Sequence, residues 1–92
     1  MELGKLQAWA RENYGEKVGS LSLDYGVARL LTQSGQLGEA VLKQHEDIDK
    51  ELADVLFVLI NLANRCDIDL DEALRQYLYE RSPEEILERI SS

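Results

Sequence analysis

The sequence contains one cysteine and one proline among 92 residues, and it has no long uncharged hydrophobic run. A single thiol, Cys66, forms no internal disulfide and offers no zinc-ligand spacing, which excludes a disulfide scaffold and a zinc finger. No apolar segment approaches the roughly 20 residues that span a membrane. The first residues also lack the apolar core and cleavage pattern of a secretion signal. We therefore expect a cytoplasmic protein that does not associate with membranes.

Positive charge is scarce too, because 10 Lys and Arg residues stand against 18 Asp and Glu residues, for a net charge of −8. Proteins that coat nucleic acids or anionic membranes present a basic face, so no nucleic-acid binding is expected. Hydrophobic residues make up 45% of the chain, which is enough for a globular fold. The length fits one domain over residues 1–92, but a core of this size is often completed by oligomerisation.

Hydrophobic residues recur at helical spacing along the chain and predict an all-α fold. The expected helices cover residues 2–13, 22–44, 47–65, a segment that begins after Asp69, and a last segment from Pro83 to about residue 90. Residues 14–20 contain two glycines and are predicted to form a loop. Asp69 and Ser82 are expected to cap the last two helices, each with a glutamate three positions later.

The middle of the third expected helix, residues 55–60, is apolar on all sides and contains β-branched and aromatic residues that would also suit a strand. Since the apolar pattern continues from Leu52 through Ala63, which is longer than a typical strand, we predict a helix. A helix that is apolar all round is normally surrounded by protein. A chain this short can hardly surround it alone, which favours a helical hairpin completed into a four-helix-type bundle by dimerisation.

One line of polar residues interrupts this apolar helix. Steps of three or four residues place Glu51, Asp54, Asn61 and Arg65 on one face. Charged side chains on an otherwise buried helix are costly unless they are paired, bound to metal or facing a wet cavity. The line is therefore either a solvent-facing stripe or the wall of a binding site.

An antiparallel hairpin of the second and third helices can bring a second polar pair to this line. With a turn near residues 45–46, Glu39 lies at the height of Glu51, and Gln36 lies at the height of Asp54. Facing carboxylates repel each other, and a hard cation removes that penalty. Mg²⁺ takes oxygen ligands and is often shared with substrate phosphates, so these four positions form a candidate Mg²⁺ site.

Which face of the second helix packs against the third decides whether the two pairs meet. Gln36 and Glu39 fall on the side away from the main apolar stripe, which consists of Val27, Leu30, Leu31, Leu37 and Val41. The pairs meet if the contact is instead made by Ala28, Thr32 and Gly35, on the side of Glu39. Gly35 and Gly38 are expected where another element approaches closely, which favours the second arrangement.

These two pairs carry a family resemblance. Gln36-x-x-Glu39, then Glu51-x-x-Asp54, and then Leu-Ala-Asn-Arg-Cys-Asp-Ile-Asp-Leu at residues 62–70 resemble the MazG-like all-α nucleotide pyrophosphohydrolases, over roughly residues 30–74. The resemblance implies hydrolysis of a nucleoside triphosphate to a monophosphate and pyrophosphate, including damaged or non-standard nucleotides. It also implies Mg²⁺ as the cofactor, with Mn²⁺ as an alternative, and a homo-oligomer, either a dimer or a tetramer. Glu39, Glu51 and Asp54 would be the catalytic metal ligands, joined by Gln36.

The chain departs from the family pattern at two places. Gly35 and Gln36 stand where the motif opens with two acids, and Gln offers a carbonyl oxygen without charge. Relatives often carry a phosphate-binding lysine in the fourth helix, whereas residues 77–81 contain none. Arg65, Arg75 and Arg81 are the residues that can replace it.

Four further residues are substrate-binding candidates. Trp9 and Tyr25 can stack on a base, or they can cover the core of the hairpin. Asn61 and Arg65 extend the polar line and can reach a sugar or phosphate. Two alternatives to the enzyme stay open: a catalytically weakened relative that only binds metal or nucleotide, and a helical assembly module whose acids are surface residues.

Overall fold

The computed structural model describes residues 2–91, and the elements along this part of the chain are helical. They are α1 (Leu3–Gly19), α2 (Leu23–Leu42), α3 (Ile48–Arg65), α4 (Leu70–Leu74), the π-helical turn η1 (Arg75–Tyr79) and α5 (Pro83–Ser91). The described residues contain no strand, and residues 55–60 lie within α3, so the predicted all-α fold is confirmed. None of these helices combines the length and apolar character needed to cross a membrane.

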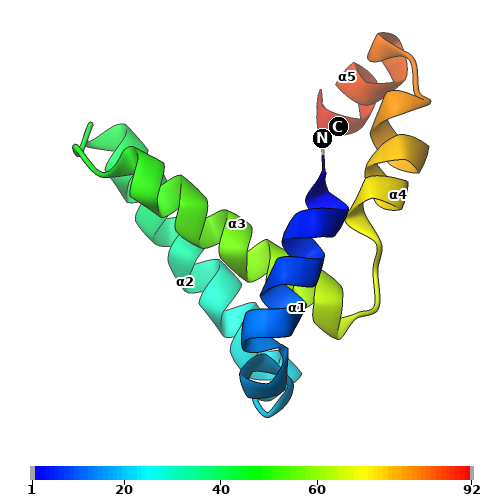
Figure 1. Ribbon diagram of the computed structural model, residues 1–92. Coiled ribbons are helices and arrows are strands. Elements are labelled where there is room, and N and C mark those ends of the chain that lie inside the picture. The colour runs from blue at the N-terminus through cyan, green and yellow to red at the C-terminus, as the bar shows by residue number, and fades with distance from the viewer. Residues whose placement is uncertain (1, 92) are drawn as a thin grey trace.

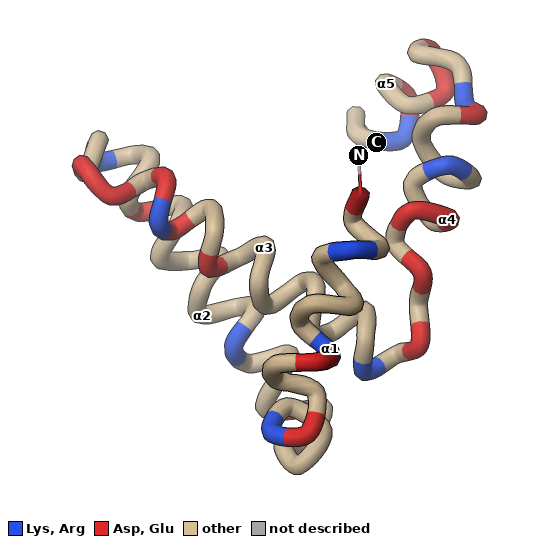
Figure 2. The backbone as a smooth tube through the Cα atoms, viewed as in Figure 1, with Lys and Arg blue, Asp and Glu red and all other residues tan. Residues whose placement is uncertain are grey.

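Figure 1 shows α2 and α3 lying side by side as a hairpin, with α1 crossing α3 near the end that leads to α4. The segment from α4 to α5 forms an arm that contacts α1 through α4 and extends away from the hairpin. The tip of the hairpin and the arm carry most of the charged residues, while the middle of the hairpin carries few (Figure 2). The crossing of α1 with α3 lies between the hairpin and the arm and connects the two.

The buried core lies at this crossing. It is formed by Leu3, Ala10 and Ile60, with Leu6, Leu70 and Leu74 packed against them. Asp71 of α4 closes the N-terminal end of α1, because its carboxylate accepts hydrogen bonds from the backbone N–H groups of Leu3 (3.1 Å) and Gly4 (2.8 Å). The carboxylate satisfies two donors that a helix start leaves unpaired.

The predicted loop at residues 14–20 is wrong, because α1 continues through Gly15 to Gly19. Each glycine costs a helix about 1 kcal/mol relative to alanine. Tertiary contacts offset that cost: the ring of Tyr14 packs edge-to-face against Phe57 of α3, with centroids 5.1 Å apart. The carbonyl of Val18 also accepts a hydrogen bond of 3.0 Å from Arg65.

The predicted caps of the last two helices are confirmed. Asp69 Oδ1 accepts a hydrogen bond from the backbone N–H of Glu72 at 3.2 Å. Ser82 and Glu85 form a reciprocal capping box, with N–H to side-chain oxygen distances of 3.2 and 3.3 Å. These short-range signals were readable in the sequence because each involves residues only three positions apart.

Candidate functional site

The face of α2 that packs against α3 differs from both faces considered in the sequence. It is a line of buried and half-buried residues at spacings of three and four: Gly26, Leu30, Gln33, Leu37 and Ala40. Three members of the expected apolar stripe, Val27, Leu31 and Val41, are exposed. The side chain of Leu62 packs closely against α2 at Gly26, where a Cβ atom would lie 3.0 Å from Leu62 Cδ2.

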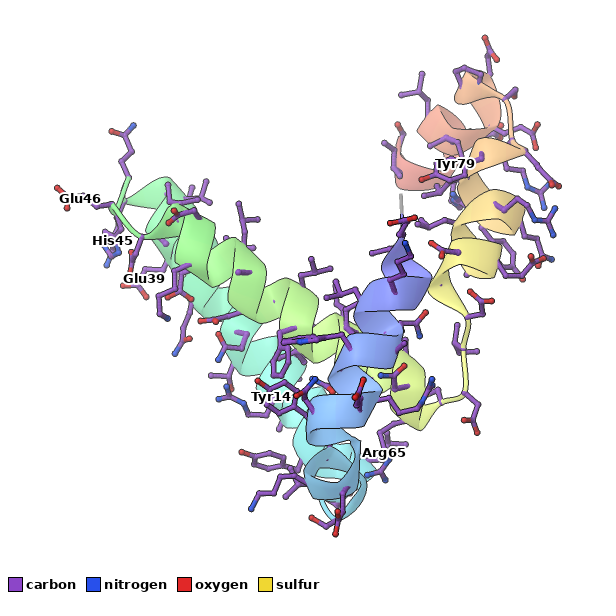
Figure 3. All side chains as sticks on the ribbon, in the orientation of Figure 1. Tyr14, Glu39, His45, Glu46, Arg65 and Tyr79 are labelled. Atoms are coloured by element: carbon purple, nitrogen blue, oxygen red, sulfur yellow. The ribbon has the colours of Figure 1, made fainter. Side chains whose placement is uncertain are left out.

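The predicted close approach at Gly35 and Gly38 is wrong, because a Cβ atom at either position would meet nothing within 4 Å. Gln36 and Glu39 are exposed as well. The carboxylate of Glu39 pairs with Lys43, the residue that follows α2, at 2.9 Å. Figure 3 shows Glu39 near the tip of the hairpin, where His45 and Glu46 also lie. The structure therefore does not bring Gln36 and Glu39 into the buried contact with α3.

The predicted polar line on α3 does lie at the contact between the two helices. The side chain of Glu51 is only 12% exposed, and Asp54, one turn further along, is partly buried. Asn61 is buried, and its Nδ2 donates to the carbonyl of Phe57 at 3.0 Å. At Glu51 and Asn61 the line therefore does not face the solvent.

Lys50 is the cation nearest to this carboxylate pair. Its Nζ lies 2.9 Å from Asp54 Oδ2 and 3.7 Å from Glu51 Oε1. The hydrogen bond to Asp54, followed by the charges of Asp54 and Glu51, raises the pKa of Lys50. The side chain of Lys50 is nevertheless mostly exposed, so the pairing with it is a surface ion pair.

Two buried oxygen atoms of the hairpin have no hydrogen-bond partner within residues 2–91: Glu51 Oε2 on α3 and Gln33 Oε1 on α2. A buried acceptor without a donor is costly, and two acceptors cannot satisfy each other. A hard cation that takes oxygen ligands suits such atoms, and Mg²⁺ is often bound by one or two carboxylates together with substrate phosphates. Glu51 and Asp54 therefore fit a divalent cation, although no cluster of three or more His, Cys, Asp or Glu residues suited to a metal occurs within residues 2–91.

Sequence reasoning missed Gln33. The signal that could have found it is its position in the line Gly26, Leu30, Gln33, Leu37 and Ala40, which keeps the spacing of a helix–helix seam. In the structure Gln33 is only 7% exposed. It brings a neutral oxygen to the face where the sequence predicted that Gln36 and Glu39 would lie.

A cavity of about 170 Å³ opens between the end of α1, the start of α2 and the second half of α3. Its walls are mainly apolar and include Tyr25, Phe57 and Leu62, with Asn61 and Arg29 as polar lining residues. Val58, also in the wall, follows Asp54 by one turn, which is about 6 Å along the helix axis. The cavity and the carboxylate pair thus lie next to each other along α3.

Two predicted substrate-binding residues serve structural contacts. Arg65 lines the cavity, but its Nη1 donates to the carbonyls of Val18 (3.0 Å) and Leu21 (2.5 Å), which connects α3 to the link between α1 and α2 (Figure 3). Trp9 is half exposed and packs edge-to-face against Tyr14 and Phe57, with centroids 5.4 and 6.4 Å apart. It does not line the cavity.

Two of the three arginines proposed to replace the missing lysine of the fourth helix, Arg75 and Arg81, lie on the arm, whereas Arg65 ends α3. Arg81 is 3.6 Å from Glu85. Arg75 pairs with Glu72 and Glu80. The structure therefore does not bring Arg81 together with Glu51 and Asp54 within one chain, and Figure 1 shows the arm and the hairpin on different sides of α1.

The chain is thus an all-α domain built on a helical hairpin, with two carboxylates on α3 and a cavity one turn away. A family model described as the MazG nucleotide pyrophosphohydrolase domain matches residues 22–86. The chain belongs to this family, which confirms the resemblance seen in the sequence. The match begins at the cap of α2 and ends in α5, and it includes both carboxylates. Comparisons with curated proteins and with solved structures give no match.

Proposed function

We propose that the chain is a Mg²⁺-dependent nucleoside triphosphate pyrophosphohydrolase that acts in the cytoplasm, on substrates that include non-standard nucleotides. Water would add to the α-phosphorus, the bond between the α-phosphorus and the bridging oxygen would break, and a monophosphate and pyrophosphate would leave. The observation that carries this proposal is the buried, unpartnered Glu51 Oε2 beside Asp54, inside the segment that matches the family. Mn²⁺ is the alternative cofactor.

Glu51 and Asp54 are the residues that would hold the cation, with the phosphate oxygens of the substrate completing its coordination. Gln33 Oε1 can add a neutral oxygen from α2. When bound, a divalent cation neutralises developing charge on the phosphate and lowers the pKa of water. The helical hairpin supplies the positioning, because both carboxylates extend from a helix that is packed along its length against α2.

The cavity is the part of the chain that we assign to the nucleoside. Its apolar walls include the rings of Tyr25 and Phe57, which can contact a base. Asn61 provides polar groups that can distinguish one base from another. The start of the cavity lies about one helical turn from Asp54, which is a suitable span for the sugar and α-phosphate.

The test is pyrophosphate release from a panel of standard and modified nucleoside triphosphates, with Mg²⁺, with Mn²⁺ and with chelator. We expect release that requires the metal, and a loss of at least about 100-fold in Glu51→Gln and Asp54→Asn, as for the removal of a group that stabilises transition-state charge. Glu16→Gln, which removes an exposed carboxylate from α1, is the matched control and should keep full activity. No release above background for any nucleotide would refute the enzyme proposal.

Glu39→Gln belongs in the same series. The family motif implies that Glu39 is a third metal ligand, whereas the structure pairs its carboxylate with Lys43. A loss of activity as large as in Glu51→Gln would support the motif and would require α2 to rotate in the active protein. Retained activity would assign Glu39 to the pair with Lys43.

A second candidate is a relative that binds metal or nucleotide with little turnover. The observation that favours it is the neutral character of α2 at the site, where Gln33 is buried and Glu39 lies outside the contact. This candidate predicts that Mg²⁺ raises the thermal stability, because a ligand that binds only the native state stabilises it, while pyrophosphate release stays at background. An assembly module without a site would show neither effect.

We also propose that the chain works as a homo-oligomer, a dimer or a tetramer. A folded monomer of this mass is expected to expose about 5,400 Å², whereas this chain exposes 6914 Å². A standard interface buries about 800 Å² per partner, so the excess is large enough to supply one. The exposed apolar residues that support this proposal gather on the hairpin: Val27, Leu31, Val41, Leu42, Leu52, Leu56 and Leu59.

A further inference from the structure

Lys50 already places a positive charge on the carboxylate pair. Its Nζ bridges the two acids, at 2.9 Å from Asp54 and 3.7 Å from Glu51. The two acids are three residues apart on one helix face, so a single cation can contact both. The ammonium group thus lies on the same two carboxylates to which the proposed function assigns a divalent cation.

The position of Lys50 in α3 is unfavourable for a cation apart from this contact. It lies in the first turn of the helix, where Asp49 and Glu51 are also found. The helix macrodipole is positive at this end and disfavours a further positive charge. Lysine N-terminal to an acid at a spacing of four residues is also the weaker orientation of such a pair. The carboxylates are therefore the interaction that keeps the ammonium group there.

We infer that Lys50 is a tethered counter-ion that competes with divalent cations for Glu51 and Asp54 and thereby sets the concentration at which the site loads. This inference rests on the proposed function, because it concerns the same carboxylate pair. A divalent cation displaces the ammonium group because it carries twice the charge and approaches carboxylate oxygens to about 2.0–2.1 Å in the case of Mg²⁺. The flexible, mostly exposed side chain of Lys50 can then move into solvent.

The competition has a definite size. The exposed ion pair that the metal must break is weak. The ammonium group of Lys50 also repels the incoming metal as long as it stays near the site. Together these two effects predict that Lys50→Gln binds divalent cations about 3- to 10-fold more tightly than the unchanged protein at low ionic strength. Lys50→Arg keeps the charge and should bind like the unchanged protein. The difference between Lys50→Gln and the unchanged protein should shrink at high salt, because screening weakens interactions between exposed charges.

Lys5 offers a control away from the site. Its Nζ lies 3.1 Å from Glu2, and its side chain is 78% exposed against 66% for Lys50. Lys5→Gln therefore changes the net charge by the same amount and breaks an exposed ion pair at the start of α1, which carries none of the proposed metal ligands. A general effect of charge on metal binding would appear equally in both variants, whereas a local competition appears only in Lys50→Gln.

The experiment titrates Mn²⁺ into the full chain and measures bound Mn²⁺ by electron paramagnetic resonance, with calorimetry for Mg²⁺. Tighter binding in Lys50→Gln alone, or binding that is measurable only in this variant, supports the inference. Equal affinity in Lys50→Gln and the unchanged protein overturns it and leaves the proposed function intact, as does equal tightening in Lys5→Gln. Absence of binding in all variants overturns both the inference and the metal dependence of the proposed function.

Discussion

Gln7 and Asn64, 57 residues apart in the chain, hydrogen-bond each other in both directions across the contact between α1 and α3. Gln7 Nε2 donates to Asn64 Oδ1 at 3.1 Å, and Asn64 Nδ2 donates to the carbonyl of Gln7 at 3.0 Å. Gln7 Nε2 also donates to the carbonyl of Ile68 at 2.7 Å, and its Oε1 accepts from the N–H of Leu70 at 2.9 Å. One buried glutamine thereby joins α1 to the end of α3 and to the start of α4.

We predict that Gln7→Ala lowers the free energy of unfolding by about 1–3 kcal/mol, because it leaves the partly buried carbonyl of Ile68 and N–H of Leu70 without these hydrogen bonds. Urea denaturation followed by circular dichroism measures the change. Gln36→Ala, on the exposed side of α2, is the control and should stay within about 0.5 kcal/mol of the unchanged protein. A loss below about 1 kcal/mol in Gln7→Ala would mean that solvent replaces these hydrogen bonds.

Arg65 provides a second prediction, which separates a structural role from a role in substrate binding. Its Nη1 donates to the carbonyls of Val18 and Leu21, so Arg65→Ala should lower the free energy of unfolding by about 1.5–3 kcal/mol, as expected for hydrogen bonds from a charged group. Lysine can keep one of these bonds, and Arg65→Lys should lose less. Denaturation and the KM for the nucleotide are measured on the same samples. A rise in KM without a loss of stability would instead assign Arg65 to the substrate.

Short-range features of the fold were predictable from the sequence, and long-range ones were not. The caps at Asp69 and Ser82 depend on residues three positions away, and both formed as expected. The helical state of residues 14–19 depends on Tyr14 packing against Phe57, which is 43 positions away and invisible to local propensity. Glycine content alone therefore predicted a loop where tertiary contacts maintain a helix.

The same distinction explains what the sequence revealed about the site. The line of Glu51 and Asp54 followed from helical periodicity on α3 alone, and the structure places it at the contact with α2. The rotation of α2 depends on how Gly26 fits against Leu62, so the buried polar residue is Gln33 and not Glu39. A small rotation of one helix changes which residues meet across the hairpin.

The glycines supply a prediction with opposite signs at two positions. Gly38 lies in the interior of α2 with open space where a Cβ atom would stand, so Gly38→Ala should stabilise the chain by about 0.5–1 kcal/mol. At Gly4 a Cβ atom would lie 2.9 Å from Asp71 Oδ2, the oxygen that accepts the N–H of Gly4, so Gly4→Ala should destabilise. Thermal denaturation of the two variants gives the comparison. A destabilised Gly38→Ala would show that a second chain packs against this surface.

The start of α5 should respond to acid. The hydrogen bond from the backbone of Ser82, followed by the one from its side chain, lowers the pKa of Glu85 below its ordinary value of 4.5. A group with a lowered pKa in the folded state stabilises the fold above its unfolded pKa and loses this effect as the pH falls through the folded value. The protection of the backbone amides of residues 84–86 against hydrogen exchange, taken relative to the intrinsic rate at each pH, should therefore fall below about pH 4.5, and Glu85→Gln should remove this pH dependence. An unchanged pH profile in that variant would assign the acid sensitivity to other carboxylates.

The exposed apolar surface of the hairpin gives the last prediction. Leu31 and Leu42 are 69% and 85% exposed on α2, and exposed apolar residues on α3 include Leu52 and Leu56. Because burying a leucine side chain contributes about 1.5–3 kcal/mol, Leu31→Glu should shift the chain from an oligomer to a monomer in sedimentation velocity. Ser34→Glu, an exposed polar position one turn further along α2, is the control for added charge. A chain that sediments as a monomer before any substitution would contradict the oligomer and would mean that 92 residues maintain this apolar surface in water without a partner.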